Sequence, residues 1–173
     1  MIYHLLYKKG ETCLIRSHPN VDNPWGRRAR SYLFMEGRNT HIAASLFYLT
    51  DIYRSIILYR WRRVDCVIFV RYLLGTAYLP SPLYKLAYRF LSRLIPGTPY
   101  MIYIKVSPAE AERRITMNRS SRERFETLEE LEKVSRKAWE LVNLGGWIII
   151  DGNRKPEDIH AEIIKVCELE RVF

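Results

Sequence analysis

The sequence has few of the residues that hold metal ions or disulfides. Its three cysteines are far apart, with no C-x-x-C pair, and its four histidines lack the spacing of metal ligands. An odd number of cysteines without metal spacing is typical of a reducing, intracellular setting. These absences disfavour a zinc-binding fold and a disulfide-stabilised secreted fold, and we predict no metal site built from these side chains.

The sequence also lacks an apolar stretch suited to a membrane. The most apolar window, residues 42–59, carries Asp51 and Arg54 near its middle, and burying that pair in lipid would be strongly unfavourable. The apolar run after Met1 is too short for a signal peptide and has no small-residue cleavage pattern. We therefore expect a soluble cytoplasmic protein without a membrane partner.

The composition is that of one globular domain with a basic surface. The 173 residues are 48% hydrophobic, and 28 Lys+Arg against 19 Asp+Glu give a net charge of +9. Such a surplus attracts phosphates on nucleotides, nucleic acids or lipids without saying which. A nucleic-acid binder is one interpretation, but the chain has no RNP-like, KH-like or helix-turn-helix pattern. We therefore expect no nucleic-acid partner.

Strand and helix patterns alternate along the chain. Continuous apolar runs, typical of strands covered on both faces, occupy residues 12–16, 66–70, 100–106 and 147–151. Helical patterns start at Asn39 or Thr40, at Ser107–Pro108, near residue 128 and at Pro156. This order predicts an α/β fold: a parallel sheet with helices on both faces, in three layers.

Arginines lie at the carboxyl ends of two of the predicted strands. Arg16 is the last residue of the first strand, and Arg71 directly follows the second. Ligands of such sheets bind beyond the carboxyl ends of the strands, so Arg71 would lie where an anion is held. An arginine that only extends from a strand end into water is an equally weighted alternative.

A second group of arginines lies between two helical patterns. Arg119, Arg122 and Arg124 fall in a segment where the helical pattern is broken, and such a flap could neutralise charge on a transferring phosphoryl group. We assign Arg113 and Arg114 instead to a solvated helix face with i,i+4 ion pairs.

Six segments, in order, resemble those of the thymidylate kinases, a family of nucleoside monophosphate kinases. The resemblance runs from about residue 5 to residue 166, over LLYKKGETCLIRSHP, NPWGRRARSYL, LFYLTDIYR, FVRYLLGTAY, YIKVSPAEAERRI with RERFETLEELEKVSRKAWEL, and IIIDGNRKPEDI. It implies a P-loop kinase type of fold, as one domain over residues 1–173 with a lid at about residues 116–126.

The resemblance also implies an activity and roles for residues. The reaction would be ATP-dependent phosphorylation of a nucleoside monophosphate, dTMP to dTDP in the family, with ATP and Mg²⁺ as cofactors. Arg71 would hold the acceptor phosphate, and Arg119, Arg122 and Arg124 would cover the donor phosphates. The acceptor pocket would be shaped by Arg16, Pro19, Arg27, Tyr48, Tyr72, Ala77 and Tyr78, and the adenine of ATP would contact Asn153 and Arg154. Small nucleotides would be the partners, and a homodimer is implied as well.

The sequence departs from the family pattern at its beginning. None of the eight glycines is followed by lysine, so the phosphate loop G-x-x-x-x-G-K-[ST] is absent, as is the strand before it. In the family that strand lies between those resembled by residues 66–70 and 100–106. Either these two strands close up, or the recorded start lies downstream of the true one, and we favour a mis-assigned start or a truncated gene.

Four further departures concern the metal and the base. Val70 replaces the motif aspartate that organises Mg²⁺ in the family, and valine offers no oxygen. Ile52, Gly75 and Leu79 replace polar residues around the base, which leaves the identity of the acceptor base open. The alternative to an enzyme is therefore a catalytically inactive relative that binds a nucleotide or a protein through the same cleft.

Overall fold

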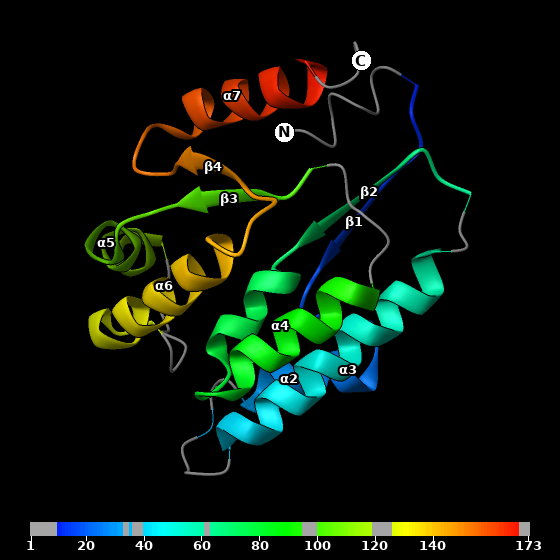
Figure 1. Cartoon of the computed structure of the whole chain (residues 1–173), viewed down its shortest axis with the longest axis vertical. Coiled ribbons are helices and arrows are strands. Elements are labelled where there is room, and N and C mark those ends of the chain that lie inside the picture. Colours follow the sequence, from blue (N-terminus) through cyan, green and yellow to red (C-terminus); the bar gives the residue numbers. More distant parts are fainter. Residues whose placement is uncertain are drawn as a thin grey trace. The chain divides into compact units, whose positions relative to one another are not determined.

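The computed structural model describes residues 10–32, 35, 40–60, 63–94, 100–118 and 126–169. These residues form two compact units (Figure 1). We call the described residues up to Leu94 the N-terminal unit and those from Tyr100 onward the C-terminal unit. That the whole chain is one domain stays a prediction.

The N-terminal unit contains a pair of parallel strands and four helices. Strands β1 (Cys13–Ser17) and β2 (Cys66–Val70) run in register, with Cys13 opposite Cys66 and Ser17 opposite Val70. The helices are α2 (Pro24–Tyr32), α3 (Thr40–Arg60), the 3-10 helix η1 (Leu73–Tyr78) and α4 (Leu83–Leu94). Helices α2 and α3 pack against each other, and α4 packs on η1.

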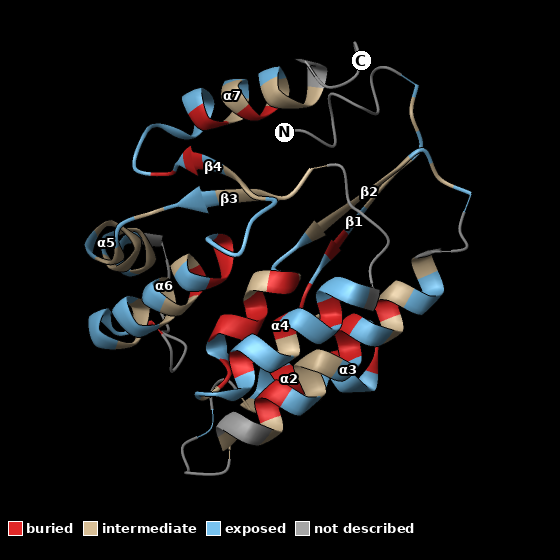
Figure 2. Ribbon diagram, in the orientation of Figure 1, coloured by how far each residue is buried: buried red, intermediate tan, exposed pale blue. Residues whose placement is uncertain are grey.

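Helix α3 carries buried polar residues beside buried apolar ones. Ile52, Asp51 and Ser55 are all 0% exposed, and Figure 2 shows buried stretches along α3 and η1. The apolar part of the core comes from several elements, including Ala29, Leu73, Ala77, Tyr88 and Leu91. A core of this kind requires internal partners for its polar groups, because a buried polar group without a hydrogen bond is costly.

The C-terminal unit is a local three-layer α/β/α arrangement. Strands β3 (Ile102–Lys105) and β4 (Ile148–Asp151) are parallel, and the helices are α5 (Pro108–Asn118), α6 (Leu128–Val142) and α7 (Pro156–Leu169). In Figure 1, α7 lies on one side of the strand pair and α6 on the other. Ile159 and Ile163 of α7 cluster with Ile150, whereas the Lys105 ammonium lies 3.9 Å from the centre of the Trp139 ring of α6. Alternate strand residues thus face different helices.

The predicted start of α5 at Ser107–Pro108 is confirmed. The Ser107 hydroxyl accepts a hydrogen bond from the Glu110 amide (3.4 Å), as expected of an N-cap before Pro108. The Glu110 carboxylate does not complete a capping box, because it pairs with Arg113 and Arg114. The Ser107 amide donates instead to Asn153 Oδ1 (2.9 Å), which links two loops of the C-terminal unit.

The α/β prediction, with parallel strands and helices between them, is confirmed, but the strands are less buried than their apolar runs predicted. Ile15, Val70, Ile104 and Ile149 are 48%, 41%, 42% and 46% exposed. Within the described ranges β2 pairs only with β1, and β3 only with β4, so each strand has one hydrogen-bonded neighbour. Two-stranded sheets leave more of each strand uncovered than a wide sheet would.

Candidate functional site

A pocket of the N-terminal unit lies where the loops after β1 and β2 meet α2, α3 and η1. Four residues that the sequence predicted for the acceptor site line it together, namely Pro19, Tyr48, Arg71 and Tyr78. The other lining residues are His18, Ala29, Ala44, Ser45, Gly75 and Leu79. The lining is thus mostly apolar and aromatic, with Arg71 as its cation.

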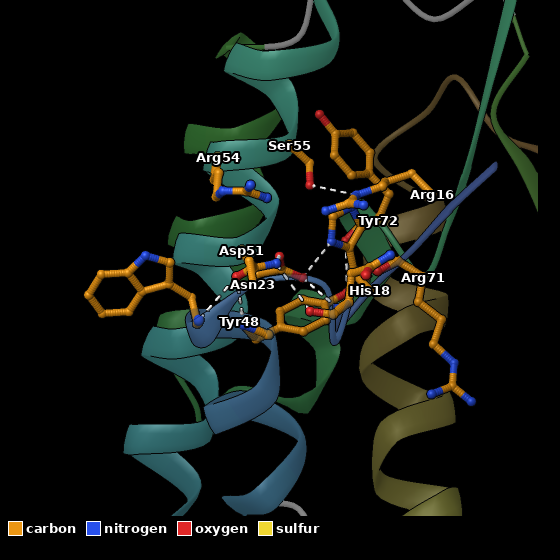
Figure 3. Close-up of polar contacts among 12 residues, drawn as sticks. Arg16, His18, Asn23, Tyr48, Asp51, Arg54, Ser55, Arg71 and Tyr72 are labelled. Carbon is orange, nitrogen blue, oxygen red and sulfur yellow. Dashed lines mark hydrogen bonds and ion pairs between the residues drawn. The ribbon is translucent and has the colours of Figure 1, made fainter. Parts of the chain in front are cut away.

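Arg71 occupies an unusual backbone conformation at this pocket. Its φ of 56° places it in the left-handed region, which costs a bulky non-glycine residue free energy and requires support from neighbouring groups. Its side chain is exposed, and in Figure 3 the guanidinium extends away from His18 and Asp51. The guanidinium is therefore accessible while the backbone of the residue is held.

Tyr48 on α3 contacts the turn that contains Arg71. Its hydroxyl donates to the carbonyl oxygen of Arg71 and lies 3.3 Å from that of Tyr72. Burial raises the pKa of Tyr48 far above its usual value, so the phenol keeps its proton and remains a donor. A Cβ on Gly75 would collide with the Tyr48 phenol, so glycine at this position leaves the ring its space.

Asp51, one turn further along α3, is the centre of a buried hydrogen-bond network. Its Oδ2 accepts from His18 Nδ1 (2.9 Å) and from the Asn20 amide (2.8 Å), and its Oδ1 accepts from Asn23 Nδ2 (2.6 Å). Burial disfavours the carboxylate, but these three donors outweigh burial and hold the pKa of Asp51 below its ordinary value. Asp51 therefore fixes the loop after β1 against α3.

Asn23 extends this network into α2. Its Oδ1 accepts from the amides of Trp25 (3.0 Å) and Gly26 (2.9 Å), as an N-cap does, while its Nδ2 donates to Asp51. His18 is stacked on Phe69 and is 1% exposed, and its Nε2 has no hydrogen-bond partner among the described residues. The loop between β1 and α2 is thus anchored at both ends.

Arg16, predicted beside the acceptor, is buried and bonds to other side chains of the protein. It is 5% exposed, and its guanidinium pairs with both oxygens of Asp22 (2.5 and 2.9 Å) and with Ser55 Oγ (3.2 Å). The hydrogen bond from Arg16 lowers the pKa of Asp22 to about 2. Arg16 therefore shapes the loop by an ion pair and is not among the residues that line the pocket.

Other predicted acceptor residues are not among those that line the pocket. Ala77 is fully buried in η1, and Tyr72 stacks its ring on Phe69 at 4.6 Å between centroids. Arg27 is exposed and donates to the Val21 carbonyl (3.1 Å). Ile52, at the position where an arginine would read the base, is a core residue with 0% exposure.

The loop after β4 holds the two residues predicted to contact adenine. Asn153 donates to Asp151 Oδ1 (2.9 Å) through its side chain, and Arg154 pairs with Glu162. Arg114 donates to the carbonyls of Gly152 (2.9 Å) and Arg154 (3.3 Å). The i,i+4 ion pair predicted for Arg114 is present, with Glu110 at 2.7 Å, and the same guanidinium also fixes this loop, which was not predicted.

The end of β2 offers no side-chain oxygen for a magnesium ion. Among the described residues no group of three His, Cys, Asp or Glu side chains could hold a metal ion. Val70 ends β2 directly before Arg71 and offers no oxygen ligand. The predicted lid arginines, Arg119, Arg122 and Arg124, lie outside the described residues.

No helix in the described ranges combines the length and the apolarity of a membrane span.

Comparison with known proteins agrees with this architecture. A family model described as "Thymidylate kinase" matches residues 1–163. The chain belongs to the thymidylate kinase family. Its fold is accordingly the α/β P-loop kinase type of thymidylate kinases, and the resemblance drawn from the six segments is confirmed.

Curated thymidylate kinases of Leptospira share part of the chain. Those of Leptospira interrogans serovars copenhageni and Lai are 36% identical over 66 residues, which is 38% of this chain and 32% of each relative. That of Leptospira borgpetersenii is 35% identical over 66 residues, with the same coverage. The match spans about a third of the length of these relatives.

Sequence reasoning missed the residues that hold the pocket's loops. Asp51, His18 and Asn23 were not assigned to a site, although a lone aspartate in the apolar window 42–59 was a signal that such a partner set exists. A buried carboxylate needs several donors. Nothing local in the sequence names the loop that supplies them.

Proposed function

We propose that the chain binds a nucleoside monophosphate in the pocket of the N-terminal unit, with Arg71 pairing with the phosphate. The observation that carries this proposal is Arg71, a supported left-handed residue that lines the pocket with Tyr48 and Tyr78 and whose side chain is exposed. Guanidinium pairs with two phosphate oxygens at once, and aromatic rings suit a base. The family makes dTMP the first candidate for the ligand.

The reaction we propose is transfer of a phosphoryl group from ATP to that phosphate. Catalysis of this type depends on positioning and charge neutralisation, for which Arg71 is the described candidate. Arg119, Arg122 and Arg124 are proposed as donor-side cations. Since Val70 leaves the end of β2 without a carboxylate and the described residues include no cluster of three ligating side chains, we derive no step through the metal.

For the adenine of ATP we propose the loop after β4. Asn153 and Arg154 are proposed to lie beside the base, and both side chains hold the loop together. They would therefore act by fixing the shape of the loop. A cytoplasmic location and a homodimer belong to the same proposal by family.

Isothermal titration with dTMP and with thymidine tests the acceptor site. Arg71→Ala should weaken dTMP binding by about 10- to 100-fold, the range for a lost hydrogen bond to a charged group. Thymidine binding should stay unchanged, because thymidine carries no phosphate. Arg89→Ala, which removes an exposed charge on α4, is the matched control and should have no effect.

An unchanged preference for dTMP over thymidine in Arg71→Ala would contradict the role of Arg71. Formation of dTDP from dTMP and Mg-ATP, followed by chromatography, tests the reaction separately. A second candidate, a non-catalytic nucleotide binder, is favoured by Val70 at the end of β2. Measurable dTMP binding with no dTDP formed would select that candidate.

A further inference from the structure

The turn that carries Arg71 is held by hydrogen bonds to consecutive carbonyl groups. The Val70 carbonyl accepts from the His18 amide (3.1 Å), and the Tyr48 hydroxyl bonds to the Arg71 carbonyl and approaches that of Tyr72. The peptide groups on both sides of Arg71 are therefore fixed from outside the turn. A left-handed arginine persists only where its surroundings determine it in this way.

The two supports of this turn come from one face of α3. Tyr48 and Asp51 are three residues apart, which places them on the same side of a helix. Asp51 holds His18 through Nδ1 (2.9 Å), and the His18 amide supports the peptide group before Arg71 by donating to the Val70 carbonyl. Tyr48 supports the peptide group after Arg71 directly, by bonding to the Arg71 carbonyl (Figure 3).

Building on the proposed function, we propose that the Tyr48 hydroxyl is a positioning group for Arg71. By donating to the Arg71 carbonyl, it keeps the backbone in the conformation that presents the guanidinium to the phosphate of the acceptor. This role is distinct from stacking of the Tyr48 ring on a base, because phenylalanine would supply that ring equally well. The role of the hydroxyl is to position Arg71 for the phosphate.

Gly75 supports this assignment independently. A Cβ there would overlap the hydroxyl and ring carbons of Tyr48. The phenol is therefore seated closely against η1, with its oxygen at the turn. A ring that only closed the pocket would need no hydroxyl at this place, and burying one would cost free energy without a partner.

Tyr48→Phe tests the proposal, because it keeps the ring and removes one oxygen. The dTMP affinity should fall about tenfold, as expected for one lost hydrogen bond, while thymidine affinity stays the same. In an Arg71→Ala background the same change should have no further effect on dTMP. Tyr53→Phe, on an exposed tyrosine of α3, is the matched control.

Two titration results would overturn the proposal: equal weakening of dTMP and thymidine, or a full Tyr48→Phe effect that persists in Arg71→Ala. If the parent chain binds no dTMP, the proposed function fails, and a ligand-independent measurement decides the inference. Carbon chemical shifts of Arg71 by NMR should report the left-handed conformation in the parent and its loss in Tyr48→Phe. A left-handed Arg71 retained in Tyr48→Phe would refute the role of the hydroxyl.

Discussion

Replacing Asp51 by asparagine should destabilise the N-terminal unit strongly, although the two side chains have the same shape. The Asp51 carboxylate is 0% exposed and receives three donors at 2.6–2.9 Å, from His18, Asn20 and Asn23. An amide has one oxygen, so its NH₂ group must replace an acceptor. At the Oδ1 position this NH₂ group would face the donor Asn23 Nδ2. At the Oδ2 position it would face two donors, His18 Nδ1 and the Asn20 amide.

Even in its better orientation, the substituted side chain would leave the amide of Asn23 opposite another donor. Asn23 cannot turn its oxygen to this position without releasing the amides of Trp25 and Gly26 at the start of α2. Asn23 Nδ2 keeps the Asn20 carbonyl (3.1 Å) and Asp22 Oδ1 (2.8 Å) as acceptors, so the buried group left without an acceptor is the new NH₂ group at position 51. Losing one charge-assisted hydrogen bond and leaving this donor unpaired amounts to about 2–4 kcal/mol. That is a large part of the ~5–15 kcal/mol that stabilises a typical domain.

Urea denaturation at pH 7, followed by far-UV circular dichroism, measures the change in the free energy of unfolding. Asp65→Asn is the control, because Asp65 also accepts hydrogen bonds, from Thr12, but at an exposed position. We expect the control to change stability far less. An Asp51→Asn change below about 0.5 kcal/mol, the range of ordinary surface substitutions, would refute the reasoning.

The effect of Asp51 should also depend on pH with a definite sign. The pKa of Asp51 is lower in the folded protein than its ordinary value of 3.8. Its contribution to stability is therefore fully present above about pH 4–5 and is lost as the pH falls through the folded pKa. The stability gap between the parent and Asp51→Asn should narrow in acid, and a gap that widens below pH 4 would contradict this sign.

Three further predictions test other contacts. Asp22→Asn should remove stability that the parent shows above pH 3.8 and loses as the pH falls toward about 2. Because the ion pair with Arg16 is partly exposed, the loss should be about 1 kcal/mol. Urea denaturation at pH 7 and at pH 3 measures the loss. Arg114→Ala should speed amide hydrogen exchange in the loop after β4 by about tenfold, because two carbonyls lose a cationic donor, and unchanged exchange would contradict that role. Gly75→Ala should lower the Tm by several degrees through its clash with Tyr48, and the loss should be smaller in a Tyr48→Ala background.

The order of the elements was predictable because its signals are local. The apolar runs at residues 66–70 and 100–106 contain β2 and β3, and Ser107–Pro108 marks the start of α5 as predicted. Thr40 begins α3, within one residue of the expected start. Capping residues and helical periodicity act within a few positions of the chain, so one sequence reveals them.

The candidate site was predictable only in part. The grouping of Pro19, Tyr48, Arg71 and Tyr78 around one pocket agrees with their predicted neighbourhood. The internal use of Arg16 was not predicted, because a guanidinium offered to a phosphate and one paired with Asp22 have the same sequence signature. Burial of the side chain distinguishes the two, and Arg16 is buried by its contacts with Ser55 and Tyr59 of α3.

By itself the sequence determined the alternation of strands and helices, the family, and the presence of an arginine after the second strand. Only the tertiary structure decided how that arginine is held. Asp51 reaches a histidine 33 residues away, and Tyr48 reaches a carbonyl 23 residues away. A hydrogen bond requires donor and acceptor within about 3 Å, and separations of that size along the chain are closed only by packing one helix against two loops.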